Sequence, residues 1–361
     1  MHGRDNNFNL IRFIAASLVV VSHSFVIYTG DMSSEPFKDI FGMYLGTMCV
    51  DIFFITSGFL ISASFLNRKS LITYIESRAL RIYPGLIGVV LLTVFIIGPI
   101  TTEDVGNYFS SSQTWSYLLR TSTLVTGVEY SLPGVFTNNP APNQINSSLW
   151  TLPYEISMYM LVPALITVAI FLKKKVKISL SKIVFPIWLA SFTFFITAHY
   201  FSLPLVTFLK LFYMFLSGAV FYISRDKILL SNRLFVLFLL CTSASVFISN
   251  TFMTAYALFL PYLILYLAYK PTGSVRKFNR LEDYSYGIYI YGFPVQQLLI
   301  LTFDFQSTFT FIAASLLATI LPAYMSWHAI EKPALKLKRS NKKPSPPRDR
   351  EQILKQTESY E

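Results

Sequence analysis

The sequence predicts an all-α, polytopic membrane protein with about ten transmembrane helices and with both termini in the cytoplasm. Of the 361 residues, 53% are hydrophobic and only 14% are charged, and the mean hydropathy is +0.50. A soluble globular chain carries about 25% charged residues, so this chain has too few charges to cover its surface in water. In addition, Lys and Arg cluster in alternate loops, which is typical of multi-pass membrane proteins.

Ten apolar segments are long enough to be membrane spans, because a helix needs roughly 20 apolar residues to cross the hydrocarbon core. The predicted spans are 10–29, 41–65, 82–100, 148–172, 184–203, 205–223, 233–250, 252–269, 285–303 and 307–327.

The loop charges support this number of spans. The loop at 30–40 is mostly acidic, and the long 102–147 loop contains Arg120 as its only Lys or Arg. Basic clusters follow every second span: Arg68, Lys69, Arg78 and Arg81; Lys173, Lys174, Lys175, Lys177 and Lys182; Arg225, Lys227 and Arg233; Lys270, Arg276, Lys277 and Arg280; Lys332, Lys336, Lys338, Arg339, Lys342 and Lys343. This alternation predicts cytoplasmic termini.

The net charge of +11 is explained by these loops, so a membrane-lipid environment is predicted and a nucleic-acid partner is not. Cys49 and Cys241 lie inside apolar segments, and His2, His199 and His328 do not cluster. Neither a disulfide framework nor a metal site is therefore expected.

One transmembrane domain is expected over residues 1–335, with 102–147 as its extracytoplasmic loop. The first segment has the basic flank of a signal peptide, but no small-residue cleavage site follows it, so we expect an uncleaved helix. Residues 336–361 are basic and polar after 344–347 (PSPP), and we expect a disordered cytoplasmic tail.

Two polar residues in the first span are candidates for function, because charge inside hydrocarbon is costly. Arg12 and His23 are eleven residues apart, which places them on one helix face about 16 Å apart along the axis. Arg12 could merely mark the cytoplasmic end of the helix, and His23 could be a packing residue. Histidine can also take up and return a proton near neutral pH, as general acid–base catalysis requires.

Two carboxylates are further candidates. Glu155 lies about two turns inside the fourth span and could orient or charge-balance His23. Alternatively, it could be a structural carboxylate paired with Lys210 or with a tyrosine. Asp51, in the middle of the second span, is a similar but weaker candidate.

Arg78 and Arg81 are three residues apart near the start of the third span and lie side by side on a helix. Arginine binds phosphate well because its planar fork donates two hydrogen bonds at once. A plain positive-inside cluster would explain the charge equally well.

The 102–147 loop combines aromatic faces with amide side chains, which suit sugars, although an interfacial segment would have a similar composition. The residues concerned are Tyr108, Trp115, Tyr117, Tyr130, Asn138, Asn139, Asn143, Gln144 and Asn146.

Six motifs occur in the order found in the acyltransferase-3 family of membrane acyltransferases, and the chain resembles that family over roughly residues 8–335. The motifs are Arg12 with His23, 53–61 (FFITSGFLI), 78–84 (RALRIYP), 148–155 (SLWTLPYE), 285–289 (SYGIY) and 331–333 (EKP). One departure is Gly292, which follows Tyr291 where many members have a histidine. If that histidine touches the acceptor, Gly292 implies a different or roomier acceptor pocket.

The resemblance implies O-acylation, usually acetylation, of an extracytoplasmic glycan such as O-antigen, capsule or exopolysaccharide, at a bacterial inner membrane. The expected donor is acetyl-CoA from the cytoplasm. The expected roles are catalysis by His23 and Glu155, donor binding by Arg12, Arg78 and Arg81, and substrate binding by Asp51, Trp150, Tyr286 and Tyr289.

A multi-span transporter or flippase of a glycan or small molecule is the alternative, because polytopic proteins with buried charges are often transporters. No inverted repeat is evident in the sequence, which favours the enzyme.

Overall fold

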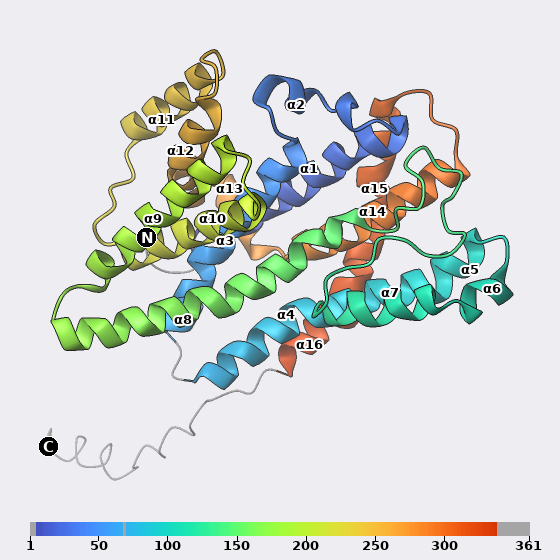
Figure 1. Cartoon of the computed structure of the whole chain (residues 1–361), viewed down its shortest axis with the longest axis horizontal. Helices are drawn as coiled ribbons and strands as arrows, with labels where there is room; N and C mark the ends of the chain where they lie inside the picture. The colour runs from blue at the N-terminus through green and yellow to red at the C-terminus, as the bar shows by residue number, and fades with distance from the viewer. Residues whose placement is uncertain (1–4, 68–69, 338–361) are drawn as a thin grey trace, which may run out of the picture.

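The computed structural model of the protein describes residues 5–67 and 70–337. Every regular element within these ranges is a helix, which confirms the all-α class (Figure 1). The long helices are α1 (Phe8–Thr29), α3 (Leu45–Leu66), α4 (Leu71–Leu92), α8 (Leu152–Val176), α9 (Leu180–Tyr200), α10 (Val206–Ile223), α12 (Phe252–Tyr269), α14 (Ser285–Thr302) and α15 (Thr308–Ser326). The shorter ones are η1 (Met32–Ser34), α2 (Pro36–Phe41), η2 (Thr93–Ile97), α5 (Gly98–Thr101), α6 (Val105–Ser110), α7 (Ser112–Thr123), η3 (Ser147–Thr151), α11 (Asn232–Ser245), α13 (Ser274–Lys277), η4 (Phe278–Arg280), η5 (Trp327–Glu331) and α16 (Lys332–Lys336).

Eight helical segments in the described part of the chain are long and apolar enough to cross a membrane, so the polytopic class is confirmed. Two of the predicted spans are not long or apolar enough to be among these eight segments. Helix α11 has 14 residues, about 21 Å of helix against a hydrocarbon core of about 30 Å. Helix α14 is less apolar because it carries Gln296 and Gln297, which are fully buried among other helices rather than facing lipid. The exact number of crossings and the side on which the termini lie stay predictions.

The third predicted span, 82–100, was placed too late in the chain. Helix α4 begins at Leu71, where the Ser70 side chain accepts a hydrogen bond from the Thr73 amide. The helical path continues through the π-helix η2 into α5. Arg78 and Arg81 therefore lie within this helix, side by side as their spacing predicted, rather than just ahead of the span.

Helices α3 and α10 pack with their backbones almost in contact. A Cβ atom at Gly58 would lie 1.9 Å from the Phe215 carbonyl oxygen, and one at Gly218 would lie 2.0 Å from the Ile55 carbonyl oxygen. Only glycine permits this approach, which is a common way for membrane helices to associate. The close packing holds α3 as a fixed wall of the candidate site.

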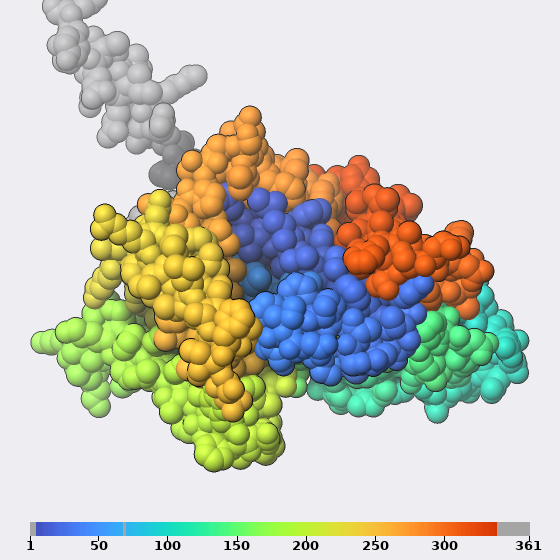
Figure 2. Space-filling view, turned by 90° about the horizontal axis from the view of Figure 1, so that it is seen from above, coloured from blue at the N-terminus to red at the C-terminus, as the bar shows by residue number. Residues whose placement is uncertain are grey.

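Helix α1 lies in the middle of the molecule and contacts α3, α14 and α15. In Figure 2, the N-terminal part of the chain (blue) lies between the segment that includes α11 (yellow) and the C-terminal helical segment (orange-red). The face of α1 that bears Arg12 and His23 is thereby enclosed by other helices rather than by lipid.

Part of the 102–147 loop forms a helical cap against α4 and its continuation, where α7 lies alongside (Figure 1). The Tyr108 hydroxyl donates to the carbonyl of Val94 in the π-helix, at 2.9 Å. Tyr108 and Tyr117 are buried by this contact. Because their faces are used in packing, these two tyrosines are not exposed to a sugar, and glycan selection by the rest of the loop stays a prediction.

The end of the same loop is attached to α14. Asn139 Nδ2 donates to the Gln297 carbonyl (3.0 Å) and to Gln297 Oε1 (2.8 Å), and Asn146 Nδ2 donates to the Ile290 carbonyl (2.7 Å). These bonds fix the polypeptide that leads into η3 and α8. The predicted tail falls largely on residues 338–361, which lie outside the described residues.

Candidate active site

Two cavities inside the bundle contain most of the predicted site residues. The arginine cavity is lined by Arg12, Arg78, Arg81, Glu155, Tyr159 and Tyr286 together with apolar residues of α3. The histidine cavity has a polar lining of Ser22, His23, Tyr44, Thr47, Gln144 and Ser147, and Trp150 lies in its wall. Val50 and Tyr289 line both cavities, so the two cavities are adjacent and share these residues as part of their walls.

The three arginines of the arginine cavity differ in their partners. Arg81 Nη2 lies 2.5 Å from Asp283 Oδ2, and Arg81 Nη1 lies 3.9 Å from Glu331 Oε2. Among the described residues, neither Arg12 nor Arg78 has a carboxylate oxygen within 4.0 Å. Arg12 and Arg78 are thus the cations left to bind an anion, while Arg81 is held by two acids.

Aromatic rings support the two unpaired arginines. The Arg12 guanidinium lies 5.6 Å from the Phe53 ring centroid, and that of Arg78 lies 5.8 Å from the Tyr159 ring centroid. Arg12 Nε is buried and has no hydrogen-bond partner in the described structure. An unsatisfied buried donor on a cation favours binding of an anionic group in this cavity.

Asp283 precedes α14 and keeps its charge. Burial acts to raise its pKa, but the charges of Arg81 and Arg12 and two hydrogen bonds from Ser285 outweigh burial and lower the pKa of Asp283 to about 2. The ion pair with Arg81 is therefore intact at every physiological pH.

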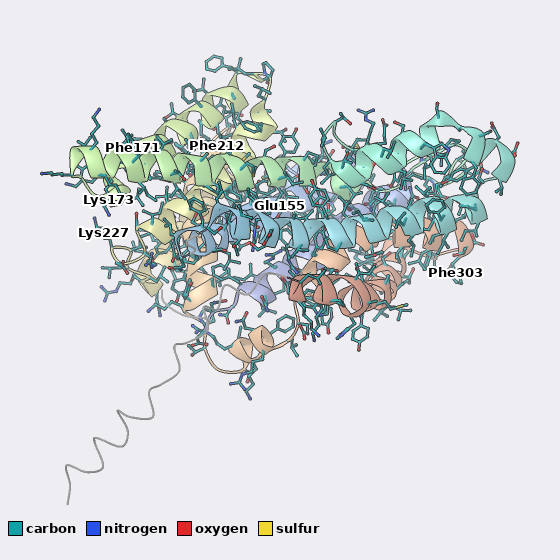
Figure 3. All side chains as sticks on the ribbon, turned by 90° about the horizontal axis from the view of Figure 1, so that it is seen from below. Glu155, Phe171, Lys173, Phe212, Lys227 and Phe303 are labelled. Carbon is teal, nitrogen blue, oxygen red and sulfur yellow. The ribbon has the colours of Figure 1, made fainter. Side chains whose placement is uncertain are left out.

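Glu155 lies in the first turn of α8 and accepts a hydrogen bond from the Tyr159 hydroxyl one turn later. Figure 3 shows Glu155 midway between the end of the molecule marked by Lys173 and Lys227 and the end marked by Phe303. Of the two structural partners considered for it, the tyrosine is the one observed, because Lys210 is paired with another acid.

His23 lies in the other cavity and forms no hydrogen bond with Glu155 in the described structure. Its Nδ1 atom is 3.4 Å from the Ser148 Oγ, and its ring packs edge-on against Phe293 with centroids 5.2 Å apart. The expected His23–Glu155 pair is thus replaced by a His23–Ser148 contact, and Glu155 shares its cavity with the arginines.

Hydrogen bonds to α14 position the Ser148 hydroxyl. The Tyr289 hydroxyl donates to the Ser148 carbonyl at 2.6 Å and lies 2.6 Å from Thr151 Oγ1. Both partners belong to the 3-10 helix η3. Because Tyr289 also lines both cavities, one side chain holds Ser148 in place and forms part of the wall between the two spaces.

The remaining candidates are distributed as follows. Trp150 lines the histidine cavity, and Tyr286 lines the arginine cavity while its hydroxyl donates to the Ile82 carbonyl at 2.7 Å. Asp51 lines neither: it is fully buried between Lys210 (3.1 Å) and the Tyr256 hydroxyl (3.0 Å). The structure thus gives Asp51 a role in joining α3 to α10 and α12.

Gly292 also lines neither cavity. A Cβ atom there would lie 2.8 Å from Val20 Cγ2, so this glycine allows α14 to approach α1. It does not enlarge either cavity, and the roomier acceptor pocket expected from it is not observed.

Sequence reasoning did not single out Ser148, Tyr159, Asp283 or Glu331 as site residues. Ser148 and Glu331 stand inside quoted motifs, and Asp283 follows Glu282 at the end of a loop whose other charges are basic, which was a usable signal. In the part of the chain that is described, no group of three or more His, Cys, Asp or Glu residues is arranged to hold a metal ion.

Comparison with known proteins decides the family. The sequence profile described as "Acyltransferase domain", of the acyltransferase-3 type, matches residues 5–328. The chain belongs to the acyltransferase-3 family. This acyltransferase is 30% identical to "O-acetyl transferase" of Shigella phage Sf6 over 339 residues, 92% of this chain and 96% of the relative.

A second relative is "Nodulation protein 10" of Rhizobium leguminosarum bv. viciae, which is 26% identical over 355 residues, 94% of this chain and 95% of the relative. No solved structure matches. The family and these relatives support a membrane O-acyltransferase rather than the transporter alternative.

Proposed function

We propose that this acyltransferase moves an acetyl group from cytoplasmic acetyl-CoA to a hydroxyl of an extracytoplasmic glycan, such as O-antigen, capsule or exopolysaccharide, in a bacterial inner membrane. The observation that carries the proposal is the pair of adjacent cavities. Unpaired arginines lie in one, a histidine lies in the other, and Val50 and Tyr289 line both.

The donor fits the arginine cavity by charge. The CoA phosphates bind Arg12 and Arg78, whose guanidinium groups have no carboxylate partner, while Arg81 stays anchored to Asp283. The pantetheine arm extends past Val50 and Tyr289 toward His23. Arg12 and His23 are about 16 Å apart along the axis of α1, which is the distance that the arm has to cover.

The acyl transfer takes place at His23. Its imidazole accepts the proton of the sugar hydroxyl while the hydroxyl oxygen attacks the thioester carbonyl carbon. The carbon–sulfur bond then breaks, and the CoA sulfur leaves with the proton returned by the imidazolium. An acyl-histidine relay would divide the same exchange into two steps. In both versions Ser148 holds the ring orientation, and Glu155 balances the cations of the donor cavity.

The proposal is tested with purified protein in nanodiscs supplied with acetyl-CoA, together with acetylation of surface glycan in cells. His23→Ala should abolish both CoA release and glycan acetylation while the protein remains folded. His199→Ala is the matched control, because His199 lies at the end of α9 against Phe195 and Tyr200 and lines neither cavity. Near-normal acetylation by His23→Ala would refute the mechanism.

A further inference from the structure

The two cavities differ in electrostatic character. Three arginines line the arginine cavity, whereas the described residues that line the histidine cavity include no Lys, Arg, Asp or Glu. Its polar groups are hydroxyls, one amide and the imidazole of His23. Such groups hydrogen-bond a sugar hydroxyl well but cannot neutralise a carboxylate or phosphate.

Charged groups lie behind this lining but not in it. Glu35 is fully buried, accepts a hydrogen bond from the Leu45 amide at 2.9 Å, and is bonded by the hydroxyl of Ser22, which lines the cavity. Lys38 lies over the Tyr44 ring at 5.1 Å and has no carboxylate oxygen within 4.0 Å among the described residues, but it does not itself line the cavity.

Trp150 supplies the apolar surface of the same cavity. Its ring packs edge-on against Tyr154 with centroids 5.8 Å apart, and it is only partly buried. An aromatic face beside hydroxyl and amide groups matches the C–H face and the hydroxyl rim of an uncharged pyranose ring. An anionic sugar in this cavity would lose its hydration without gaining a partner, which is costly.

We propose that the hydroxyl acylated at His23 belongs to an uncharged sugar residue, and that the histidine cavity excludes uronic acids and phosphorylated sugars from that position. The inference rests on the proposed function, because it takes the histidine cavity as the acceptor site. It also explains the separation of the cavities: the phosphates of the donor are attracted to the arginines and not toward His23.

The first test compares p-nitrophenyl glucoside with p-nitrophenyl glucuronide as acceptors for acetyl-CoA in nanodiscs, because the two differ only at C6. The expected kcat/KM for the glucoside is at least about tenfold higher, equivalent to about 1.4 kcal/mol. Gln144→Arg adds a cation to the cavity and should lower the ratio of the glucoside kcat/KM to the glucuronide kcat/KM. Gln113→Arg, on the exposed surface of α7, is the matched control and should leave the ratio unchanged. A glucuronide accepted as well as the glucoside would overturn the inference.

A second test does not depend on either glycoside being a substrate. Thr47→Cys places a thiol in the cavity wall, in a Cys241→Ser background that removes the exposed native cysteine. Its reaction rates with neutral, anionic and cationic methanethiosulfonates are normalised to those of free 2-mercaptoethanol. The anionic reagent should be slowest by about tenfold or more; equal or faster reaction of the anionic reagent would refute an anion-excluding cavity.

The proposed function and the inference about the acceptor can be refuted independently of each other. If acetyl-CoA is turned over in a His23-dependent way but the glucuronide is preferred, only the acceptor inference is wrong. If the protein neither binds nor turns over acetyl-CoA, the proposed function is wrong, and the thiol rates still decide the character of the cavity.

Discussion

Replacing Arg78 by alanine should weaken acetyl-CoA binding and leave the fold intact. The guanidinium of Arg78 has an aromatic neighbour, Tyr159, and a 3.4 Å contact with the Ser77 hydroxyl. Removing it breaks no ion pair among the described residues. The side chain is therefore available to a ligand, and its loss should appear mainly in donor affinity.

The magnitude follows from the type of bond. A hydrogen bond to a charged group contributes about 1.5–3 kcal/mol, and about 1.4 kcal/mol corresponds to a tenfold change in affinity. Arg78→Ala should therefore raise the Kd for acetyl-CoA roughly 10- to 100-fold. Arg81→Ala should behave differently, because it leaves Asp283 and Glu331 without their cation. Breaking a buried pair in this way costs about 3–5 kcal/mol of stability.

The assay is isothermal titration of acetyl-CoA into nanodisc-embedded protein, with the melting temperature of each variant measured in parallel. Arg225→Ala is a matched control, since Arg225 lies over the Tyr222 ring and lines neither cavity. The reasoning is refuted if Arg78→Ala binds acetyl-CoA like the wild type, or if Arg81→Ala keeps its stability and loses only binding.

Three further predictions follow from single contacts. Ser148→Ala should lower kcat by roughly tenfold or more and shift the pH profile of kcat, because the His23 ring loses its positioning partner. Ser148→Thr should recover much of the rate. An unchanged pH profile in Ser148→Ala would show that Ser148 has no part in the mechanism. Gly218→Val should lower the melting temperature in detergent, because the new Cβ would lie 2.0 Å from the Ile55 carbonyl oxygen. Overpacking of this kind costs about 1–3 kcal/mol or more. An unaffected melting temperature would contradict the close approach of α3 and α10. Asp283→Asn should cost about 2 kcal/mol at pH 7, since the pKa falls from 3.8 to about 2 on folding. A carboxyl whose pKa is lowered on folding stabilises the fold at pH values above its unfolded-state pKa, and this stabilisation is lost as pH falls through the folded-state pKa. The loss of unfolding free energy in Asp283→Asn should therefore be constant from pH 8 to about 5 and shrink below about pH 4. A loss that varies around neutral pH would contradict this assignment.

Local sequence patterns were sufficient to place most of the helices. Apolar length, loop charge and the positions of proline and glycine are properties of consecutive residues, so they predicted the all-α class and nearly every long helix. They misplaced the start of α4, because the charged residues Glu76, Arg78 and Arg81 interrupt its apolar pattern before the predicted span. They also overstated α11, whose apolar residues continue beyond the end of its helix.

The candidate site shows a sharper division. The sequence predicted Arg12, His23 and Glu155 as site residues, because a charge or a histidine in an apolar segment is conspicuous whatever surrounds it. It predicted Arg78 and Arg81 from their spacing as a pair of arginines. It could not assign partners, since pairing depends on how distant helices are rotated against one another. Asp51 and Glu155 look alike in sequence, yet one is buried beside Lys210 and the other lines a cavity.

By itself, the sequence determined that this chain is a helical membrane protein of the acyltransferase-3 type and which polar side chains lie within its hydrocarbon-spanning segments, because both depend on composition and local order. Tertiary structure alone decided that these side chains fall into two adjacent cavities, with Arg81 bound by Asp283 and His23 facing Ser148. The physical reason is that close packing at Gly58 and Gly218, and the hydrogen bonds from Tyr289 to η3, fix helix positions across more than a hundred residues of sequence, which no local pattern encodes.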